Sequence, residues 1–147
     1  MQLLNFMTGI DFGAQGNFSE FSPSGFSALP DTNSTWTEGP TAEILFRVPP
    51  LRNNVRFAVE VFPFLGDGAL TQQQCWVFFN GLFTHFDTVR MSSELVFTIS
   101  RDLFNPRVNR LSFVLPDAVS PSDLGLTDDL RRLGLAFTRL TAGSPAA

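Results

Sequence analysis

The chain of 147 residues is short of charge and of several reactive side chains. It has no lysine and no tyrosine, one cysteine and one histidine, and only 16% of its residues are charged. A single cysteine excludes an internal disulfide, and it sits in an apolar run where we expect it to act as a small buried hydrophobe. The low charge leaves few residues to keep the surface hydrated, which favours an oligomer or a docked module.

The sequence argues against two classes of partner. All ten basic residues are arginines spread along the chain, and the net charge is −4. Because a nucleic-acid-binding surface needs a basic stripe, we expect no nucleic-acid partner. No apolar run reaches the length of a membrane span, so we also expect no membrane insertion.

The N-terminal residues Met1 to Ile10 have neither the basic region nor the cleavage site of a secretory signal. We therefore expect cytoplasmic synthesis. A place in an exported or particle-associated assembly stays open.

Sequence motifs of the common enzyme and cofactor-binding families are missing. HExxH, a Cys/His cluster, a P-loop, GxGxxG and GxSxG are all absent, which predicts no catalytic residue, no metal site and no cofactor. Acids such as Asp67 and Asp87 form no glycosidase signature. Asp128 and Asp129 lie close to Arg131, and this arrangement favours a local salt-bridged turn over catalysis. An unrecognised hydrolase remains the third functional hypothesis.

Apolar residues instead alternate with polar ones at a period of two, which is typical of β-strands. About eight short strands predict an all-β, two-sheet antiparallel sandwich of jelly-roll or galactose-binding-like type. Residues 1–141 would form one domain, and residues 142–147 a flexible tail. Residues 13–35 are rich in Gly, Ser, Asn and Pro and are expected to form a long loop. The expected strands cover residues 3–7, 42–48, 55–61, 74–79, 82–87, 95–99, 111–115 and 133–137.

The strongest local signal is a β-hairpin over residues 74–87. Asn80-Gly81 stands between two apolar runs and predicts a type I′ turn, in which both central residues need a positive φ. Counting outward from this turn gives the expected cross-strand partners. The pairs are Phe79–Leu82, Phe78–Phe83, Val77–Thr84, Trp76–His85, Cys75–Phe86 and Gln74–Asp87.

This register would divide the hairpin into two faces. One face, with Cys75 at its centre, is a plain core face. The other would gather the rings of Trp76, Phe78 and Phe83, with polar groups at their edge from Gln74, His85 and Asp87. Two interpretations stay open: a sugar-binding platform, or a surface covered by another segment or subunit. The sequence alone does not decide which face points inward.

Trp36 is a second candidate ligand-binding residue. It stands at a loop–strand junction, where an indole can stack on the apolar face of a sugar. It can equally plug one end of the sandwich, and the plug is favoured because tryptophan is usually well buried.

Several motifs occur in an order that resembles a bacterial family. The family consists of β-sandwich, carbohydrate-binding-like accessory domains beside glycosyltransferase and polysaccharide-assembly modules, and the resemblance covers residues 21 to about 140. Its members typically have Gly-Trp where this chain has Gly25-Phe26, so a ligand contact by that tryptophan does not carry over. The motifs are Phe21-Ser-Pro-Ser-Gly-Phe-Ser27, Trp36-Thr-Glu-Gly-Pro-Thr-Ala42, Gln73 to Gly81, Ser120-Pro-Ser-Asp-Leu-Gly125 and Asp129-Leu-Arg-Arg-Leu-Gly134.

The resemblance implies a fold and a general role but names no ligand. It implies that Asp129 and Arg131 fix the turn into the last strand near Trp36. Family members are usually appended to larger enzymes, whereas we interpret this chain as a domain that stands alone from a Met start, which favours self-association or docking onto a larger assembly.

We therefore predict a non-catalytic module that binds a glycan or polysaccharide or attaches to a polysaccharide-handling assembly. The alternative is a structural subunit of a larger assembly, such as a cell-surface or virion-like particle. In that case the aromatic face would be a protein interface, and a homo-oligomer is expected.

Overall fold

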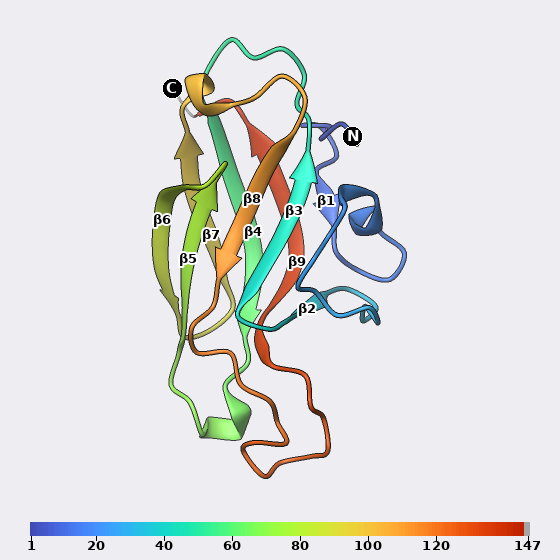
Figure 1. Cartoon of the computed structure of the whole chain (residues 1–147), viewed down its shortest axis with the longest axis vertical. Coiled ribbons are helices and arrows are strands. Elements are labelled where there is room, and N and C mark those ends of the chain that lie inside the picture. The colour runs from blue at the N-terminus through green and yellow to red at the C-terminus, as the bar shows by residue number, and fades with distance from the viewer. Residues whose placement is uncertain (146–147) are drawn as a thin grey trace.

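Alternating apolar side chains build nine strands in the computed structural model, which describes residues 1–145 (Figure 1). Those residues contain three short 3-10 helices and no α-helix: η1 (Phe18–Phe21), η2 (Gly66–Gly68) and η3 (Arg101–Leu103). The strands are β1 (Ile10–Asp11), β2 (Thr35–Glu38), β3 (Thr41–Phe46), β4 (Val55–Pro63), β5 (Gln73–Phe79), β6 (Leu82–Val89), β7 (Ser93–Ile99), β8 (Asn109–Val114) and β9 (Leu133–Gly143).

The strands form an all-β sandwich of two antiparallel sheets, as the sequence predicts. One sheet has the order β1-β9-β4-β7, with β2 also paired to β9, and the other has the order β3-β8-β5-β6. Their inner faces enclose a core dominated by phenylalanine. The largest fully buried rings are Phe12, Phe21, Phe46, Phe57, Phe79, Phe113 and Phe137.

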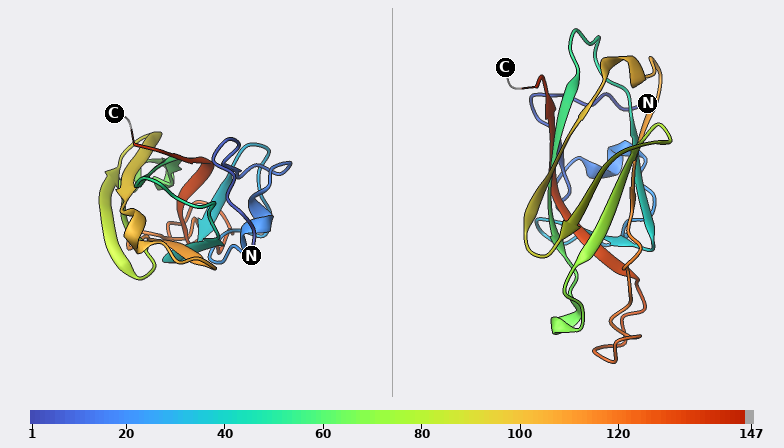
Figure 2. Two further views of the ribbon diagram at one scale, coloured as in Figure 1. Left: turned by 90° about the horizontal axis from the view of Figure 1, so that it is seen from above. Right: turned by 90° about the vertical axis from the view of Figure 1, so that its left-hand side faces the viewer.

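The two sides of the sandwich are closed differently. On one side, the segment that precedes β3 lies across the gap between the sheets (Figure 2). There β1 and β2 pair with β9, while Leu3 and Ser24 form isolated bridges with Arg47 and Glu43. On the other side, β6 and β7 are the last strands of their sheets and lie next to each other. The hairpin with the candidate site therefore forms one free edge of its sheet.

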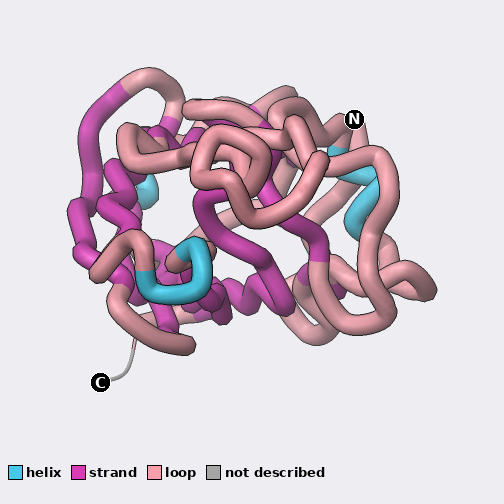
Figure 3. The backbone as a smooth tube through the Cα atoms, turned by 90° about the horizontal axis from the view of Figure 1, so that it is seen from below, coloured by secondary structure: helices cyan, strands magenta, loops and turns pink. Residues whose placement is uncertain are grey.

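The strands run lengthwise, so the connecting loops gather at two ends. In Figure 1 the upper end carries the β3–β4 connection, the β5–β6 turn and the β7–β8 connection. The lower end carries the β4–β5 and β8–β9 connections, and loops predominate there when the molecule is seen from below (Figure 3). We use "upper end" and "lower end" in this sense.

The expected opening strand over residues 3–7 is wrong. Leu3 makes only an isolated bridge, and the chain then turns because the side-chain oxygen of Asn5 accepts a hydrogen bond from the Met7 amide at 2.8 Å. Positive φ at Gly9 (65°) helps the chain turn into β1.

Residues 13–35, expected to form a long loop, contain more regular secondary structure than their composition indicates. This segment contains η1, and β2 begins at its last residue, Thr35. At the other end of the chain, β9 continues to Gly143, so the strand takes up two residues of the expected tail. Ala142 is 7% exposed and belongs to the core. Residues 146–147 of that tail lie outside the described residues.

Candidate functional site

The β5–β6 turn is the Asn80-Gly81 turn that the sequence predicts. Both residues have positive φ, 49° and 83°, as a type I′ turn requires. The Asn80 side chain also anchors the turn to neighbouring segments. Its amide nitrogen donates to the Leu103 carbonyl (2.9 Å) and to Asn109 Oδ1 (3.0 Å), and its oxygen accepts from the Arg110 amide (2.8 Å).

A β-bulge at Thr84 changes the register beyond the first two pairs. Phe79–Leu82 and Phe78–Phe83 pair as expected, but Val77 lies opposite His85. Thr84 is the extra residue, and its hydroxyl donates to the Val77 carbonyl at 3.1 Å. Since one inserted residue turns every later side chain to the other face, the expected pairs beyond the bulge are wrong. The observed pairs are Trp76–Phe86, Cys75–Asp87, Gln74–Thr88 and Gln73–Val89.

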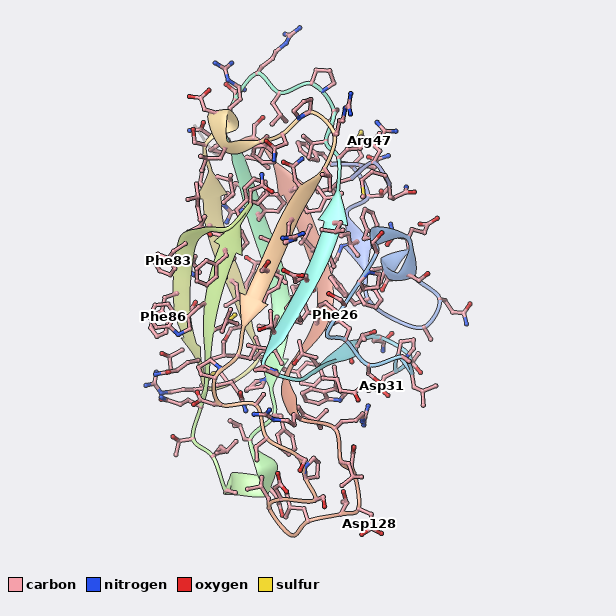
Figure 4. All side chains as sticks on the ribbon, viewed as in Figure 1. Phe26, Asp31, Arg47, Phe83, Phe86 and Asp128 are labelled. Atoms are coloured by element: carbon pink, nitrogen blue, oxygen red, sulfur yellow. The ribbon has the colours of Figure 1, made fainter. Side chains whose placement is uncertain are left out.

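Four rings form the aromatic patch on the outer face of the hairpin: Trp76, Phe78, Phe83 and Phe86. Trp76 lies between two of the others, with ring centroids 4.7 Å from Phe86 and 5.6 Å from Phe83. The Phe78 and Phe83 rings meet edge to face at 5.9 Å. Trp76 and Phe86 are each 40% exposed and Phe83 is 54% exposed, so the patch is open to solvent (Figure 4).

Polar side chains continue the same sheet face beside these rings. Glu43, Ser112, Phe78 and Phe83 are successive partners across β3, β8, β5 and β6, so their side chains share one face. The Ser112 hydroxyl donates to Glu43 Oε2 at 2.8 Å, and Arg110 Nε lies 3.7 Å from the same oxygen. We call Glu43, Ser112 and Arg110 the polar cluster. The outer face of this sheet therefore carries the aromatic patch on β5 and β6 and the polar cluster on β3 and β8.

His85 and Asp87 lie on the inner side of β6, away from the aromatic patch. His85 stacks on Phe97 of β7, with centroids 5.7 Å apart and an interplanar angle of 26°. Its Nε2 atom is 3.7 Å from Asp87 Oδ2, within ion-pair range but too long for a hydrogen bond. Cys75, the partner of Asp87, is fully buried. Burial, with a smaller contribution from the nearby Asp87 carboxylate, raises the pKa of the Cys75 thiol to about 12.

The two remaining candidate ligand-binding residues, Gln74 and Trp36, lie on different sheets. Gln74 lies on the outer face next to Trp76, and its backbone amide donates to Asp117 Oδ2 at 2.8 Å. Trp36 belongs to the other sheet, where its ring meets Phe62 edge to face at 5.2 Å. Trp36 is half-buried and does not join the aromatic patch.

The charged turn before β9 has the local structure that the sequence predicts. Arg131 Nη2 donates to Asp129 Oδ2 at 2.8 Å, and this hydrogen bond holds the pKa of the Asp129 carboxyl below its usual value. Arg131 Nη1 also donates to Ser27 Oγ at 3.1 Å, and the Ser27 amide donates to the Trp36 carbonyl. The pair therefore ties the turn to the strand that carries Trp36.

Gly25 and Phe26, which stand where the resembled family has Gly-Trp, have a structural role. A side chain at Gly25, with φ of 75°, would collide with the Thr41 carbonyl oxygen. The Phe26 ring packs on Phe18 at 4.9 Å and on Phe137 at 5.2 Å. This motif therefore supports the core.

Sequence reasoning missed Phe86 and the polar cluster. Alternation along 41–46 indicates that Glu43 points away from the core, but nothing local shows that β3 and β8 lie beside β5. Within residues 1–145, no group of three or more His, Cys, Asp or Glu side chains could hold a metal ion. The same part of the chain has no helix of the length and apolar character that crossing a membrane requires.

Comparisons with known proteins find a shared fold but no shared sequence family. No family model and no curated protein sequence matches the chain. Among solved structures, the CBM36-1 domain of a multidomain xylanase from the hindgut metagenome of Trinervitermes trinervoides aligns with a TM-score of 0.51 and 9% identity. That alignment covers 88% of this chain and 95% of that one. The fold resembles that of a carbohydrate-binding module.

Two further structures align with lower scores. A CBM36 module in complex with calcium and xylotriose has a TM-score of 0.45 and 9% identity, over 82% of this chain and 87% of that one. CBM51-2 in complex with GlcNAc, with INT domains, from Clostridium perfringens ZmpB has a TM-score of 0.37 and 12% identity, over 90% of this chain and 25% of that one. Such low identities concern the fold alone, because one fold hosts many functions.

Proposed function

We propose that this protein is a non-catalytic module that binds carbohydrate through the outer face of its β3-β8-β5-β6 sheet. The observation that carries the proposal is the open aromatic patch with the polar cluster on the same face. Aromatic rings stack on the apolar C–H faces of sugars, and convergent polar groups fix the orientation of a ligand. The fold shared with a carbohydrate-binding module supports this assignment.

The contact residues we propose differ in part from those expected from the sequence. Trp76, Phe78 and Phe83 would supply stacking together with Phe86, and Gln74 would lie at the margin. Hydrogen bonds would come from the polar cluster in place of His85 and Asp87, which the bulge turns inward. Trp36 would act as a packing residue on the other sheet.

The experiment is retention of the purified protein on a panel of immobilised polysaccharides. Trp76→Ala should abolish retention while the protein stays folded. Leu130→Ala is the matched control, because Leu130 is an apolar side chain of the lower end that is 79% exposed. Retention that survives Trp76→Ala, or that Leu130→Ala removes as well, would contradict the proposal.

A second candidate function has one observation in its favour. β6 is the last strand of its sheet and carries two of the exposed rings, so the same surface could pair with another protein subunit. Light scattering separates the two functions. A discrete oligomer that Phe83→Ala dissociates, with no retention on any polysaccharide, would favour a structural subunit.

A further inference from the structure

The two ends of the sandwich carry opposite charge, although the charged residues are scattered along the sequence. The strand directions bring six of the ten arginines to the upper end, against the single acid Asp102, and five acids to the lower end, against Arg90, Arg131 and Arg132; Figure 4 shows Arg47 and Asp128 at opposite ends. The upper arginines, all exposed, are Arg47, Arg52, Arg56, Arg101, Arg107 and Arg110. The lower acids are Asp67, Asp117, Asp123, Asp128 and Asp129.

Carboxylates neutralise little of the positive charge at the upper end. Among residues 1–145, Arg110 is the only upper arginine within ion-pair distance of an acid, Glu43. The hydrogen bonds of two others fix their position without removing charge. Arg47 Nε donates to the Met1 carbonyl (2.9 Å), and Arg101 Nη1 donates to the Arg52 carbonyl (3.0 Å). The upper end therefore presents guanidinium groups to solvent.

A groove at the upper end adjoins the polar cluster at Arg110. It has a volume of about 410 Å³ and is lined by Leu45, Asn80, Asn105, Val108 and Arg110. Arg110 belongs both to this groove and to the polar cluster. Asn105 also lines a neighbouring hollow of about 360 Å³ that contains Arg101. Both volumes lie in the range of roughly 300–1,000 Å³ typical of small-molecule sites.

Two polar side chains of the groove are available for a ligand. The Asn80 amide is committed to three hydrogen bonds within the protein. In contrast, no hydrogen bond within the described residues uses the Asn105 side-chain amide or the Arg110 guanidinium. A guanidinium matches a carboxylate with two parallel N–H groups, which makes arginine the preferred partner of such anions.

We propose that the ligand is an acidic polysaccharide, with sugar units on the aromatic patch and carboxylates on the arginines of the upper end. This inference rests on the proposed function of the patch and specifies the class of glycan. The chain would enter the groove beside Arg110 and continue toward Arg101 and Arg107. The acidic lower end would repel the same polymer, so the bound ligand is expected to extend from the patch toward the upper end.

A single-stranded nucleic acid would also combine stacking with negative charge, but the charge around the patch disfavours it. Nucleic-acid sites follow the backbone with basic groups alongside the stacking rings. Here the charged group in the row of Phe78 and Phe83 is the Glu43 carboxylate. Arg110 is the upper-end arginine nearest the rings, and its guanidinium lies 3.7 Å from that carboxylate.

The test compares polygalacturonate with its fully methyl-esterified form, which keeps the sugar backbone and removes the charge. We expect the protein to bind the acid about tenfold more tightly at low salt, the effect of one charge-assisted contact. Raising the ionic strength from roughly 50 to 300 mM should reduce this preference by screening. The double variant Arg101→Gln/Arg107→Gln, which leaves the polar cluster intact, should lose the preference and still bind the ester. Arg132→Gln/Arg90→Gln makes the same charge change at the lower end and should keep the preference.

The outcomes separate this inference from the proposed function. Trp76-dependent binding of both polymers with equal affinity would overturn the inference and leave the function standing. Failure to bind any polysaccharide would overturn both. Acid binding that survives Trp76→Ala, or equal binding of a single-stranded DNA oligomer or of vesicles containing anionic lipid, would reduce the upper end to a general anion surface and overturn the inference.

Discussion

The indole of Trp76 lies 4.7 Å from the ring of Phe86, its cross-strand partner, on the solvent-exposed face of the hairpin. Both side chains remain 40% exposed after this contact. A pair of exposed rings held on adjacent strands forms a preorganised surface, because the sheet fixes both backbones before any ligand arrives.

The exposure of Trp76 predicts a modest stability cost for its removal. We expect Trp76→Ala to lower the free energy of unfolding by roughly 1–2 kcal/mol, as for a partly buried side chain. Phe137→Ala, at a fully buried ring, should cost about 3–5 kcal/mol. Urea unfolding of both variants measures the difference. Equal losses would mean that the Trp76 face is covered in solution.

The bulge hydroxyl predicts a second effect on stability. Thr84→Val keeps the side-chain shape but leaves the Val77 carbonyl without its Thr84 partner, so we expect a loss of about 1 kcal/mol. Thr88→Val is the control, because the Thr88 hydroxyl makes no hydrogen bond within the described residues. Chemical denaturation of the two variants compares them directly, and indistinguishable midpoints would show that the hydroxyl does not hold the bulge.

Two variants of the hairpin turn separate the contribution of backbone strain to the unfolding free energy from that of side-chain hydrogen bonds. A methyl group added at Gly81 would meet open space, but the φ of this residue is 83°, so Gly81→Ala should cost about 1–2 kcal/mol from strain alone. Asn80→Ala has similar strain and also loses three hydrogen bonds, so its cost should reach roughly 2–3 kcal/mol. Thermal unfolding ranks the two, and a milder Asn80 variant would argue against the anchoring role of that amide.

The buried thiol predicts a loss of stability in alkaline solution. The folded pKa of Cys75 is raised from 9.0 to about 12, so the folded state keeps its proton while the unfolded state releases it. Below pH 9 the thiol is protonated in both states, so the difference in pKa does not change the free energy of unfolding. Between pH 9 and 12 the unfolded state loses its proton first, and the free energy of unfolding falls progressively. The gap in unfolding free energy between wild type and Cys75→Ala should therefore narrow over that window. A gap that stays constant would contradict the raised pKa.

Local patterns predicted much of the fold because their physical causes are local. The Asn80-Gly81 turn follows from backbone sterics, and the strand faces follow from a period of two. The bulge at Thr84 has no such signal, since a threonine in an alternating run fits a regular strand equally well. The placement of Glu43 and Ser112 beside Phe78 depends on the order of strands in the sheet, which sequence-distant contacts decide. The same is true of the charged ends.

The separation of charge between the ends gives the molecule a permanent dipole moment along its long axis. A dipole in the field of a charged surface experiences a torque before any contact is made, so the arginine-bearing end would lead the approach to an anionic matrix. Productive encounters would then outnumber those of a randomly oriented particle, and their rate would fall as added salt weakens the field.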